Sequence, residues 1–351
     1  NSKQFRICER ILLKKIMINL DNEIVLIGGL GYVGSSIARY FNSKKINVSI
    51  LDNNIYEKKI VKDERNQYLD VDIREDKIIS DIDFSSKNII LLSGLVGDPI
   101  TNKYPEASEE INLLYMKKLI TKLNKCNKLI FISTCSNYGL SSTNEALNEN
   151  SSLNPISLYS KAKVEIENFL ISSDINYTIL RFATAFGHSD NMRFDLTLNE
   201  FTVYQYFNKY LEVYDYETFR PYCHVNDFAN IIEKVLDSPN EYVKGEIFNV
   251  GSEENNISKK ELIKIVCNLT QNNNYDLVSK TKDKRNYVVD FSKVERVLNF
   301  KTEYSIKEGI QEIINNLQIN KYDLNEDFNK VSNYYGNYFI SDKNLELKRI
   351  N

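Results

Sequence analysis

The fold of this chain is decided by one stretch, Glu23-Ile24-Val25-Leu26-Ile27-Gly28-Gly29-Leu30-Gly31-Tyr32-Val33-Gly34-Ser35. A short apolar run, typical of a buried strand, leads into three glycines with the spacing G-x-x-G-x-x-G. The residues that follow are apolar at every fourth position, which is typical of an amphipathic helix. Strand, glycine turn and helix in this order present backbone N–H groups and a helix N-terminus to a pyrophosphate.

The three glycines have separate expected roles in such a turn. Gly28 permits the tight turn, Gly31 lets phosphates approach the backbone, and Gly34 lets the helix pack closely on the strand. A second apolar strand ends at Asp52, 18 residues after Gly34. An acid at this place holds the diol of an adenosine ribose, so the sequence predicts dinucleotide binding rather than a purely structural glycine turn. The same acid repels a 2′-phosphate, which favours NAD over NADP.

The composition limits the class of protein. The chain has 351 residues, 42% of them hydrophobic, and a net charge of −3. These values predict a sizeable core and give no basic surface that would indicate a nucleic acid partner. The apolar runs are only as long as strands, so no membrane span is expected. Five scattered cysteines and two histidines predict free thiols in a reducing cytoplasm and no metal site.

Strand and helix patterns alternate, which predicts an α/β fold: a Rossmann-like, doubly wound parallel sheet with a smaller C-terminal substrate-binding lobe. Strands are expected at about 23–28, 47–52, 67–71, 88–93, 128–133, 177–182 and 246–251. Helices are expected at about 32–43, 105–125, 157–172, 227–236, 258–270, 292–298 and 305–317. The expected division is an extension or surface helix at 1–16, an NAD-binding domain at 17–187 completed by 222–251, the lobe at 188–221 and 252–318, and a polar tail at 319–351.

The expected helix at 105–125 has two apolar faces. Ile111, Tyr115 and Leu119 share one face, and Met116 begins another. This is more apolar surface than one helix needs against a sheet, so a partner helix from a second subunit is one interpretation. Burial of both faces within one chain is the other.

A second motif, Y-x-x-x-K, indicates a reaction centre. Its spacing places Tyr159 and Lys163 on one face of a helix, where the ammonium could lower the pKa of the phenol and make it a base near neutral pH. Residues 133–139, Ser-Thr-Cys-Ser-Asn-Tyr-Gly, follow the fifth expected strand, and strand ends are where an open α/β sheet forms its site. Thr134 would orient a substrate hydroxyl against Tyr159. The three residues predict transfer of a proton and a hydride at one carbinol carbon.

Together these motifs resemble the extended short-chain dehydrogenase/reductase family that acts on nucleotide-activated sugars, over roughly residues 22–318. Further matches are the pair at 72–73, the small residues at 93–99, Asn112, the segment at 181–184, the R-P-x-x-H-V-x-D stretch at 220–227 and Arg285. The segment at 192–199 resembles the substrate lobe of a subgroup of sugar epimerases or dehydrogenases. Ile27 stands where the family usually has threonine.

The resemblance implies NAD as the cofactor and a nucleotide-diphosphate sugar as the substrate. The cofactor is expected to contact Gly28, Gly31, Tyr32, Val33, Gly34, Asp52, Asn53, Asp72, Ile73, Ser93, Gly94, Leu95, Asn112, Ser133, Tyr159, Lys163, Phe182 and Ala183. The substrate is expected to contact Val96, Thr134, Thr184, Arg193, Asn199, Arg220 and Arg285. The two arginines at 220 and 285 would hold the diphosphate, although salt bridges at the surface are an alternative role for them.

Departures from the family narrow the predicted reaction. A 4,6-dehydratase has an acidic pair after the threonine, and here Cys135 and Ser136 take those positions, which argues against dehydration. Epimerase–reductases that make deoxysugars use a cysteine and a histidine. Cys135 is one position out of that register and is expected to be a packing residue, whereas His188 is either a loop residue or such an acid–base group. His224 is expected to be structural.

The sequence therefore predicts an NAD-dependent nucleotide-sugar 4-epimerase or 4-dehydrogenase with Tyr159 as the base. Two alternatives remain: an NAD(P)H-dependent reductase of 4-keto sugars, and a non-catalytic dinucleotide sensor on the same fold. The resemblance also implies a homodimer and a role in cytoplasmic polysaccharide biosynthesis.

Overall fold

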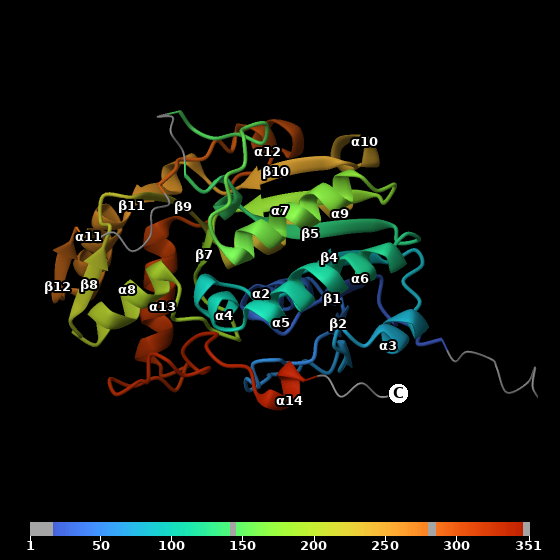
Figure 1. Cartoon of the computed structure of the whole chain (residues 1–351). Coiled ribbons are helices and arrows are strands. Elements are labelled where there is room, and N and C mark those ends of the chain that lie inside the picture. Colours follow the sequence, from blue (N-terminus) through green and yellow to red (C-terminus); the bar gives the residue numbers. More distant parts are fainter. Residues whose placement is uncertain (1–16, 141–144, 280–285, 347–351) are drawn as a thin grey trace, which may run out of the picture.

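The computed structural model describes residues 17–140, 145–279 and 286–346. Its centre is a seven-stranded sheet in the order β10-β6-β5-β4-β1-β2-β3, and every pair of neighbours is parallel (Figure 1). The strands are β1 (Ile24–Ile27), β2 (Val48–Leu51), β3 (Gln67–Leu69), β4 (Asn88–Leu91), β5 (Lys128–Thr134), β6 (Tyr177–Phe182) and β10 (Glu246–Val250). All seven strands were expected from the sequence, and the predicted doubly wound parallel sheet is confirmed.

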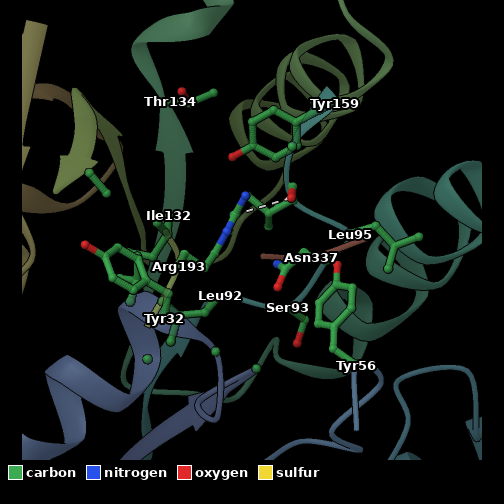
Figure 2. Close-up of a pocket in the computed structure, with 18 of the residues that line it drawn as sticks. Tyr32, Tyr56, Leu92, Ser93, Leu95, Ile132, Thr134, Tyr159, Arg193 and Asn337 are labelled. Atoms are coloured by element: carbon green, nitrogen blue, oxygen red, sulfur yellow. Dashed lines mark hydrogen bonds between the residues drawn. The ribbon is translucent and has the colours of Figure 1, made fainter. Parts of the chain in front are cut away.

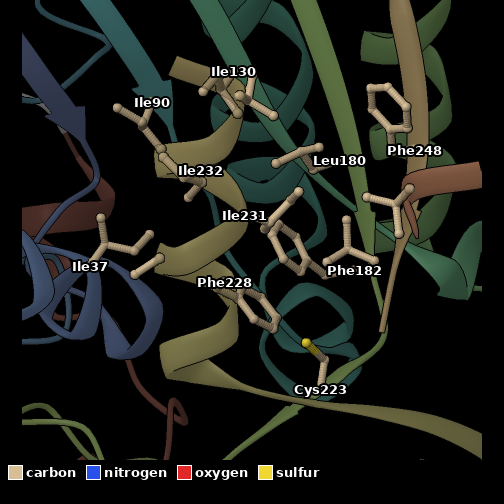
Figure 3. Close-up of a cluster of buried hydrophobic side chains, with 14 of the residues drawn as sticks. Ile37, Ile90, Ile130, Leu180, Phe182, Cys223, Phe228, Ile231, Ile232 and Phe248 are labelled. Carbon is tan, nitrogen blue, oxygen red and sulfur yellow. The ribbon is translucent and has the colours of Figure 1, made fainter. Parts of the chain in front are cut away.

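Helices cover both faces of the sheet, because alternate residues of each strand point to opposite sides. On one face, α2 (Tyr32–Ser43) and α9 (Val225–Asp237) bury residues such as Ile37 and Phe228 against Ile90 and Leu180 (Figure 3). On the other face, α6 (Met116–Lys122) and α7 (Leu158–Ile171) pack on the remaining strand residues. A short helix, α3 (Asp76–Asp81), packs on the same face of the sheet, where its Ile79 is buried.

The chain reverses the direction of strand addition between β1 and β4. From β1 it proceeds through β2 to β3 at one edge, and it then returns to β4 and proceeds outwards to β10. At such a switch point the connections that leave the carboxyl ends of the two strands run in opposite directions, and the crevice between them is where open α/β sheets bind ligands.

The single helix expected at 105–125 is divided into three segments. An α-helix, α5 (Pro105–Glu109), is followed by a π-helical segment, η1 (Glu110–Tyr115), and then by α6. A further helix, α4 (Asp98–Lys103), precedes them and was not predicted. Both apolar faces are largely buried within the chain, and Leu114 is the large apolar residue of this segment that is more than half exposed.

A second core lies beside the sheet. It is formed mainly by α8 (Thr197–Tyr206), α11 (Lys259–Thr270), α13 (Ile306–Gln318) and the parallel pair β8 (Leu211–Tyr214) and β12 (Tyr275–Val278). A three-stranded sheet, β11 (Asn256–Ser258), β9 (Phe219–His224) and β7 (Thr184–Phe186), connects this core to the main sheet. The remaining short elements are η2 (Cys135–Tyr138), α10 (Asn240–Val243), η3 (Glu253–Asn255), α12 (Ser292–Leu298) and α14 (Asp342–Leu345).

Residues 319–346, which we call the C-terminal strap, pack against the rest of the protein. The strap leaves the end of α13, passes along the lower side of the molecule and reaches α14 near β2 (Figure 1). Tyr335 and Ile340 are buried, as are Tyr322 and Leu324. No helix among the described residues has both the length and the apolar character needed to cross a bilayer.

Candidate active site

A cavity of about 460 Å³ lies at the carboxyl ends of the central strands (Figure 2). It brings together nearly all the residues that the sequence singled out. These are Gly28, Gly31, Tyr32, Val33, Gly34, Asp52, Asn53, Asp72, Ile73, Ser93, Gly94, Leu95, Val96, Ser133, Thr134, Tyr159, Lys163, Phe182, Ala183, Thr184, Arg193 and Arg220.

The glycine turn is shaped by two close approaches and one open position. Gly28 has φ +86°, and a Cβ there would lie 2.5 Å from the Ser93 backbone nitrogen. A Cβ on Gly34 would lie 2.6 Å from backbone atoms of Gly29. A Cβ on Gly31 would meet only the Gly28 carbonyl oxygen, at 3.8 Å. Space is therefore kept free beside Gly31, at the start of α2, where a pyrophosphate fits a helix N-terminus.

Asp52 braces the same turn. Its two carboxylate oxygens accept hydrogen bonds from the backbone N–H groups of Leu30 at 2.9 Å and Asn54 at 2.8 Å. Burial raises the pKa of this carboxyl. Because Asp52 also lines the cavity, it is placed to accept hydrogen bonds from a ribose diol. Together with the open position at Gly31, this acceptor fits NAD.

Asp72 lies next to this position and is already paired. Its carboxylate accepts hydrogen bonds from the buried Arg74 guanidinium at 2.9 and 3.0 Å and from Asn53 Nδ2 at 2.5 Å. The side chain of Asp72 therefore fixes the loop after β3.

Tyr159 and Lys163 project from the first turns of α7 towards the end of β5. Tyr159 lines the cavity (Figure 2). Lys163 Nζ lies 5.9 Å from the centre of the Tyr159 ring. Lys163 Nζ donates a hydrogen bond to the Ile132 carbonyl at 2.8 Å and lies 4.5 Å from the centre of the Phe131 ring. This anchoring holds the ammonium beside the phenol.

The structure does not show the expected lowering of the Tyr159 pKa by Lys163. Burial raises the pKa of Tyr159, the positive charge of Arg193 opposes this effect, and the negative charge of Asp98 adds to it. Burial lowers the pKa of Lys163 to about 8. The sequence places the pair on one helix face, but it does not show how deeply both groups are buried.

The lowered pKa of Lys163 predicts how the free energy of unfolding depends on pH. Between about pH 8 and pH 10.5 the unfolded chain keeps a proton on this lysine that the folded protein has lost, so stability rises with pH in this window. In the ligand-free protein, we expect the free energy of unfolding of wild type to rise by about 2 kcal/mol more than that of Lys163→Met between pH 7 and pH 10. Denaturant melts at the two pH values measure this. Lys161→Met, an exposed lysine of the same helix, should behave like wild type; an equal rise for Lys163→Met would contradict the prediction.

A buried ion pair fixes the end of β5. Arg181, 3% exposed, donates hydrogen bonds to Glu167, 1% exposed, at 2.6 to 3.1 Å. The Ser133 hydroxyl and the Asn137 amide also donate to Glu167. The next residue, Thr134, lines the cavity, and its hydroxyl accepts a hydrogen bond from the Ser136 N–H at 3.1 Å. The network thus positions the Thr134 hydroxyl at the cavity wall.

Arg193 enters the cavity from the second core, paired with Asp195 at 2.6 and 3.0 Å. The sequence also assigned Asn199 to the substrate, but this side chain does not line the cavity. Its amide accepts a hydrogen bond from the Gly187 N–H and donates to the Tyr32 hydroxyl and the Arg193 carbonyl. Asn199 is therefore a positioning residue that fixes the backbone of Arg193.

Asn112, expected to contact the cofactor, likewise acts through the backbone. Its Oδ1 accepts a hydrogen bond from the Leu95 N–H at 2.7 Å, and its Nδ2 donates to the Leu95 carbonyl at 3.0 Å. It lies behind the cavity wall and fixes the loop after β4.

Arg220 lines the cavity and lies 5.1 Å from the centre of the Tyr287 ring. Arg285 and the segment 1–16 lie outside the described residues.

The histidines and Cys135 are structural. His188 bonds to the Tyr322 hydroxyl away from the cavity, and burial lowers its pKa to about 4, so it is not placed as an acid–base group. His224 caps α9 and bonds to Glu312 at 2.8 Å. Burial raises the pKa of Cys135, whose thiol bonds to the Arg181 carbonyl. Within the described ranges, no three His, Cys, Asp or Glu side chains are grouped to hold a metal ion.

Several residues of the cavity were missed by the sequence reasoning. They are Tyr56, Lys58, Asp98, Asn191, Asp195, Lys259, Asn337 and Tyr338. Asp98 and Asp195 lie within the segments 93–99 and 192–199, which carry the resemblance, so their charged side chains could have been predicted to line the site. The others lie in segments without a recognisable motif. Burial and the nearby Arg193 lower the pKa of Lys58 to about 7.

Comparison with known proteins agrees with this geometry. A model described as the NAD dependent epimerase/dehydratase family matches residues 24–251. A putative UDP-glucose 4-epimerase of Methanocaldococcus jannaschii is 23% identical over 305 residues, which cover 83% of this chain and 97% of that protein. A UDP-glucose 4-epimerase of Lactobacillus helveticus is 26% identical over 177 residues, 48% of this chain and 53% of its own length.

Solved structures share the fold at lower identity. The UDP-glucose 4-epimerase of Thermotoga maritima, with UDP-glucose, has a TM-score of 0.75 at 21% identity and covers 87% of this chain and 100% of its own. The dTDP-glucose 4,6-dehydratase DesIV of Streptomyces venezuelae, with NAD, has a TM-score of 0.75 at 19% identity and covers 87% and 98%.

Proposed function

Because the chain belongs to the NAD dependent epimerase/dehydratase family, we propose that it oxidises the C4 hydroxyl of a nucleotide-diphosphate sugar and acts as a 4-epimerase. One observation carries the proposal: Tyr159 lines the same cavity as the glycine turn. A base and a pyrophosphate site in one cavity suit the oxidation of a carbinol by a dinucleotide.

Each residue of the cavity has a separate role in the proposed reaction. The Thr134 hydroxyl shares the substrate oxygen and orients it, and Tyr159 takes the hydroxyl proton as the C4 hydride leaves. In the proposed complex with cofactor and substrate, the Lys163 ammonium, anchored on the Ile132 carbonyl, holds a ribose and favours the phenolate. Gly31, Asp52 and the loop after β4 would hold NAD, which when bound supplies the hydride acceptor.

Several observations support epimerisation over dehydration. The two residues after Thr134 carry no carboxylate; Cys135 is buried and Ser136 lines the cavity. Full-length relatives in the comparisons include a putative UDP-glucose 4-epimerase. Arg220 lines the cavity and is our candidate ligand for the diphosphate, and UDP-sugars are the first substrates to try. A 4-dehydrogenase, in which the ketone leaves, is the second candidate, because the same residues serve both outcomes.

The test is incubation of the protein and NAD with UDP-glucose, UDP-glucuronic acid and dTDP-glucose. Inverted sugar without net NADH supports the epimerase, whereas free ketone with equal NADH supports the dehydrogenase. Consumption of NADPH with a 4-keto sugar, and no reaction with the three sugars, would replace the proposal with a reductase.

We also propose a homodimer. Leu114 in η1, with Leu158 and Ile171 of α7, leaves large apolar side chains exposed on neighbouring helices, which is typical of an interface. Light scattering of the purified chain tests this. The cytoplasmic location and the role in polysaccharide biosynthesis stay predictions.

A further inference from the structure

The C-terminal strap contributes to the wall of the active-site cavity. Asn337 and Tyr338 line the cavity, and the stick view draws Asn337 among Tyr56, Ser93 and Arg193, which line it as well (Figure 2). The strap follows residue 318 and lies outside residues 24–251, which match the family model.

One side of the strap is attached to the loops that would hold the adenosine of NAD. The Asn344 amide donates to the Ile55 carbonyl, in the loop after Asp52, at 3.1 Å. Arg74, which pairs with Asp72, donates to the carbonyls of Asn344 and Leu345 at 2.5 and 3.1 Å. The strap is thus hydrogen-bonded to both loops that end the second and third strands.

The other side of the strap is attached to the second core. The Phe194 N–H donates to the Tyr335 carbonyl at 2.8 Å, and a Cβ on Gly336 would lie 2.6 Å from the Asp195 carboxylate carbon. Asp195 is the partner of Arg193, which enters the cavity. The strap therefore crosses the cavity between the adenosine side and the substrate side.

Asn333 makes four hydrogen bonds that shape the crossing segment. Asn333 Nδ2 donates to the carbonyls of Tyr56 at 3.1 Å and Phe339 at 2.9 Å. Its Oδ1 accepts from the N–H groups of Tyr338 at 3.0 Å and Phe339 at 2.8 Å. The Lys103 ammonium lies 3.6 Å from the centre of the Phe339 ring, and this cation–π contact attaches the segment to the end of α4.

We propose that Asn337 and Tyr338 are binding residues of the dinucleotide site, and that the strap retains the reduced cofactor between oxidation and return of the hydride. The extended dinucleotide must reach from Asp52 to Tyr159 in a cavity that these two residues help to wall. Its release then requires the strap to lift from Tyr56 and Asp195. Retention suits a 4-epimerase, so the inference rests in part on the proposed function, but the binding step does not require a sugar.

The test measures how fast bound NADH leaves. The full-length protein is loaded with NADH and mixed with excess NAD, and the fall in bound NADH fluorescence is followed. Asn333→Ala removes four hydrogen bonds that shape the strap without touching the cavity, and it should speed the release of NADH by about tenfold or more. Tyr338→Ala should do the same by removing part of the wall. Val331→Ala, at a strap residue that is 54% exposed and does not line the cavity, is the matched control and should release NADH like wild type.

Release rates of both variants within twofold of wild type would overturn the inference, as would a chain that binds no NADH. Thermal melts check that each variant is folded. If Asn333→Ala is not folded, the release rate of Tyr338→Ala alone decides the test. If no sugar is epimerised but both variants release NADH faster, the retention role stands and only the proposed reaction fails.

Discussion

Replacing Tyr159 with phenylalanine is expected to lower turnover of the sugar substrate by about 10³-fold, because a positioned acid–base group supplies an effect of this size. The ring stays in place and only the hydroxyl is removed, so the affinity for NAD should change little. Steady-state kinetics with the substrate found for wild type, and a separate NAD titration, measure the two effects.

Tyr242→Phe is the matched control for this experiment. It removes the same atom from an exposed tyrosine of α10, outside the cavity, and should leave both rate and affinity unchanged. Turnover by Tyr159→Phe close to that of wild type would remove the proposed base. The non-catalytic dinucleotide sensor would then be the better interpretation of the fold.

The second large effect concerns Gly31. This residue has φ −71° and ψ 179°, which any residue adopts, and a Cβ would find open space. Gly31→Val should therefore fold, with a melting temperature near that of wild type. Its side chain would occupy the space kept for the pyrophosphate, so NAD affinity should fall by roughly 100-fold, or about 2.7 kcal/mol.

Gly28→Ala is the contrasting variant. Its Cβ would collide with Ser93 in a backbone conformation that L residues rarely adopt, so the fold itself should lose about 3 kcal/mol or more. Thermal melts without NAD and calorimetric titration with NAD separate the two outcomes. A Gly31→Val protein that binds NAD as tightly as wild type would contradict the assignment of the turn.

The sheet and most of the cavity could be predicted because their signals are local. Each buried parallel strand is a short apolar run, and the strand ends that carry Asp52 and Thr134 meet at one edge by the geometry of the sheet. Motif spacing then placed Tyr159 and Lys163 together. The comparisons agree with the family and with NAD, which these motifs had indicated.

What the sequence could not show depends on tertiary contacts. The pKa of Lys163 follows from its burial, which no spacing reveals. Asn199 was expected to contact the substrate, but its three hydrogen bonds to Tyr32 and backbone groups keep it out of the cavity. Asn337 and Tyr338 lie in a polar segment without a motif, and only the path of the folded chain brings them to the site.

The π-helical segment η1 has a consequence for how this region tolerates length changes. An α-helix turns by about 100° per residue, and a π segment accommodates one residue more in nearly the same rise. Here it lets Asn112 face Leu95 while Leu119 and Ile120, further along, still face the sheet. Deleting one residue between 110 and 115 would rotate Asn112 relative to Leu119 and Ile120. The helix could then keep either the hydrogen bonds of Asn112 to the loop after β4 or the packing of Leu119 and Ile120 on the sheet, but not both.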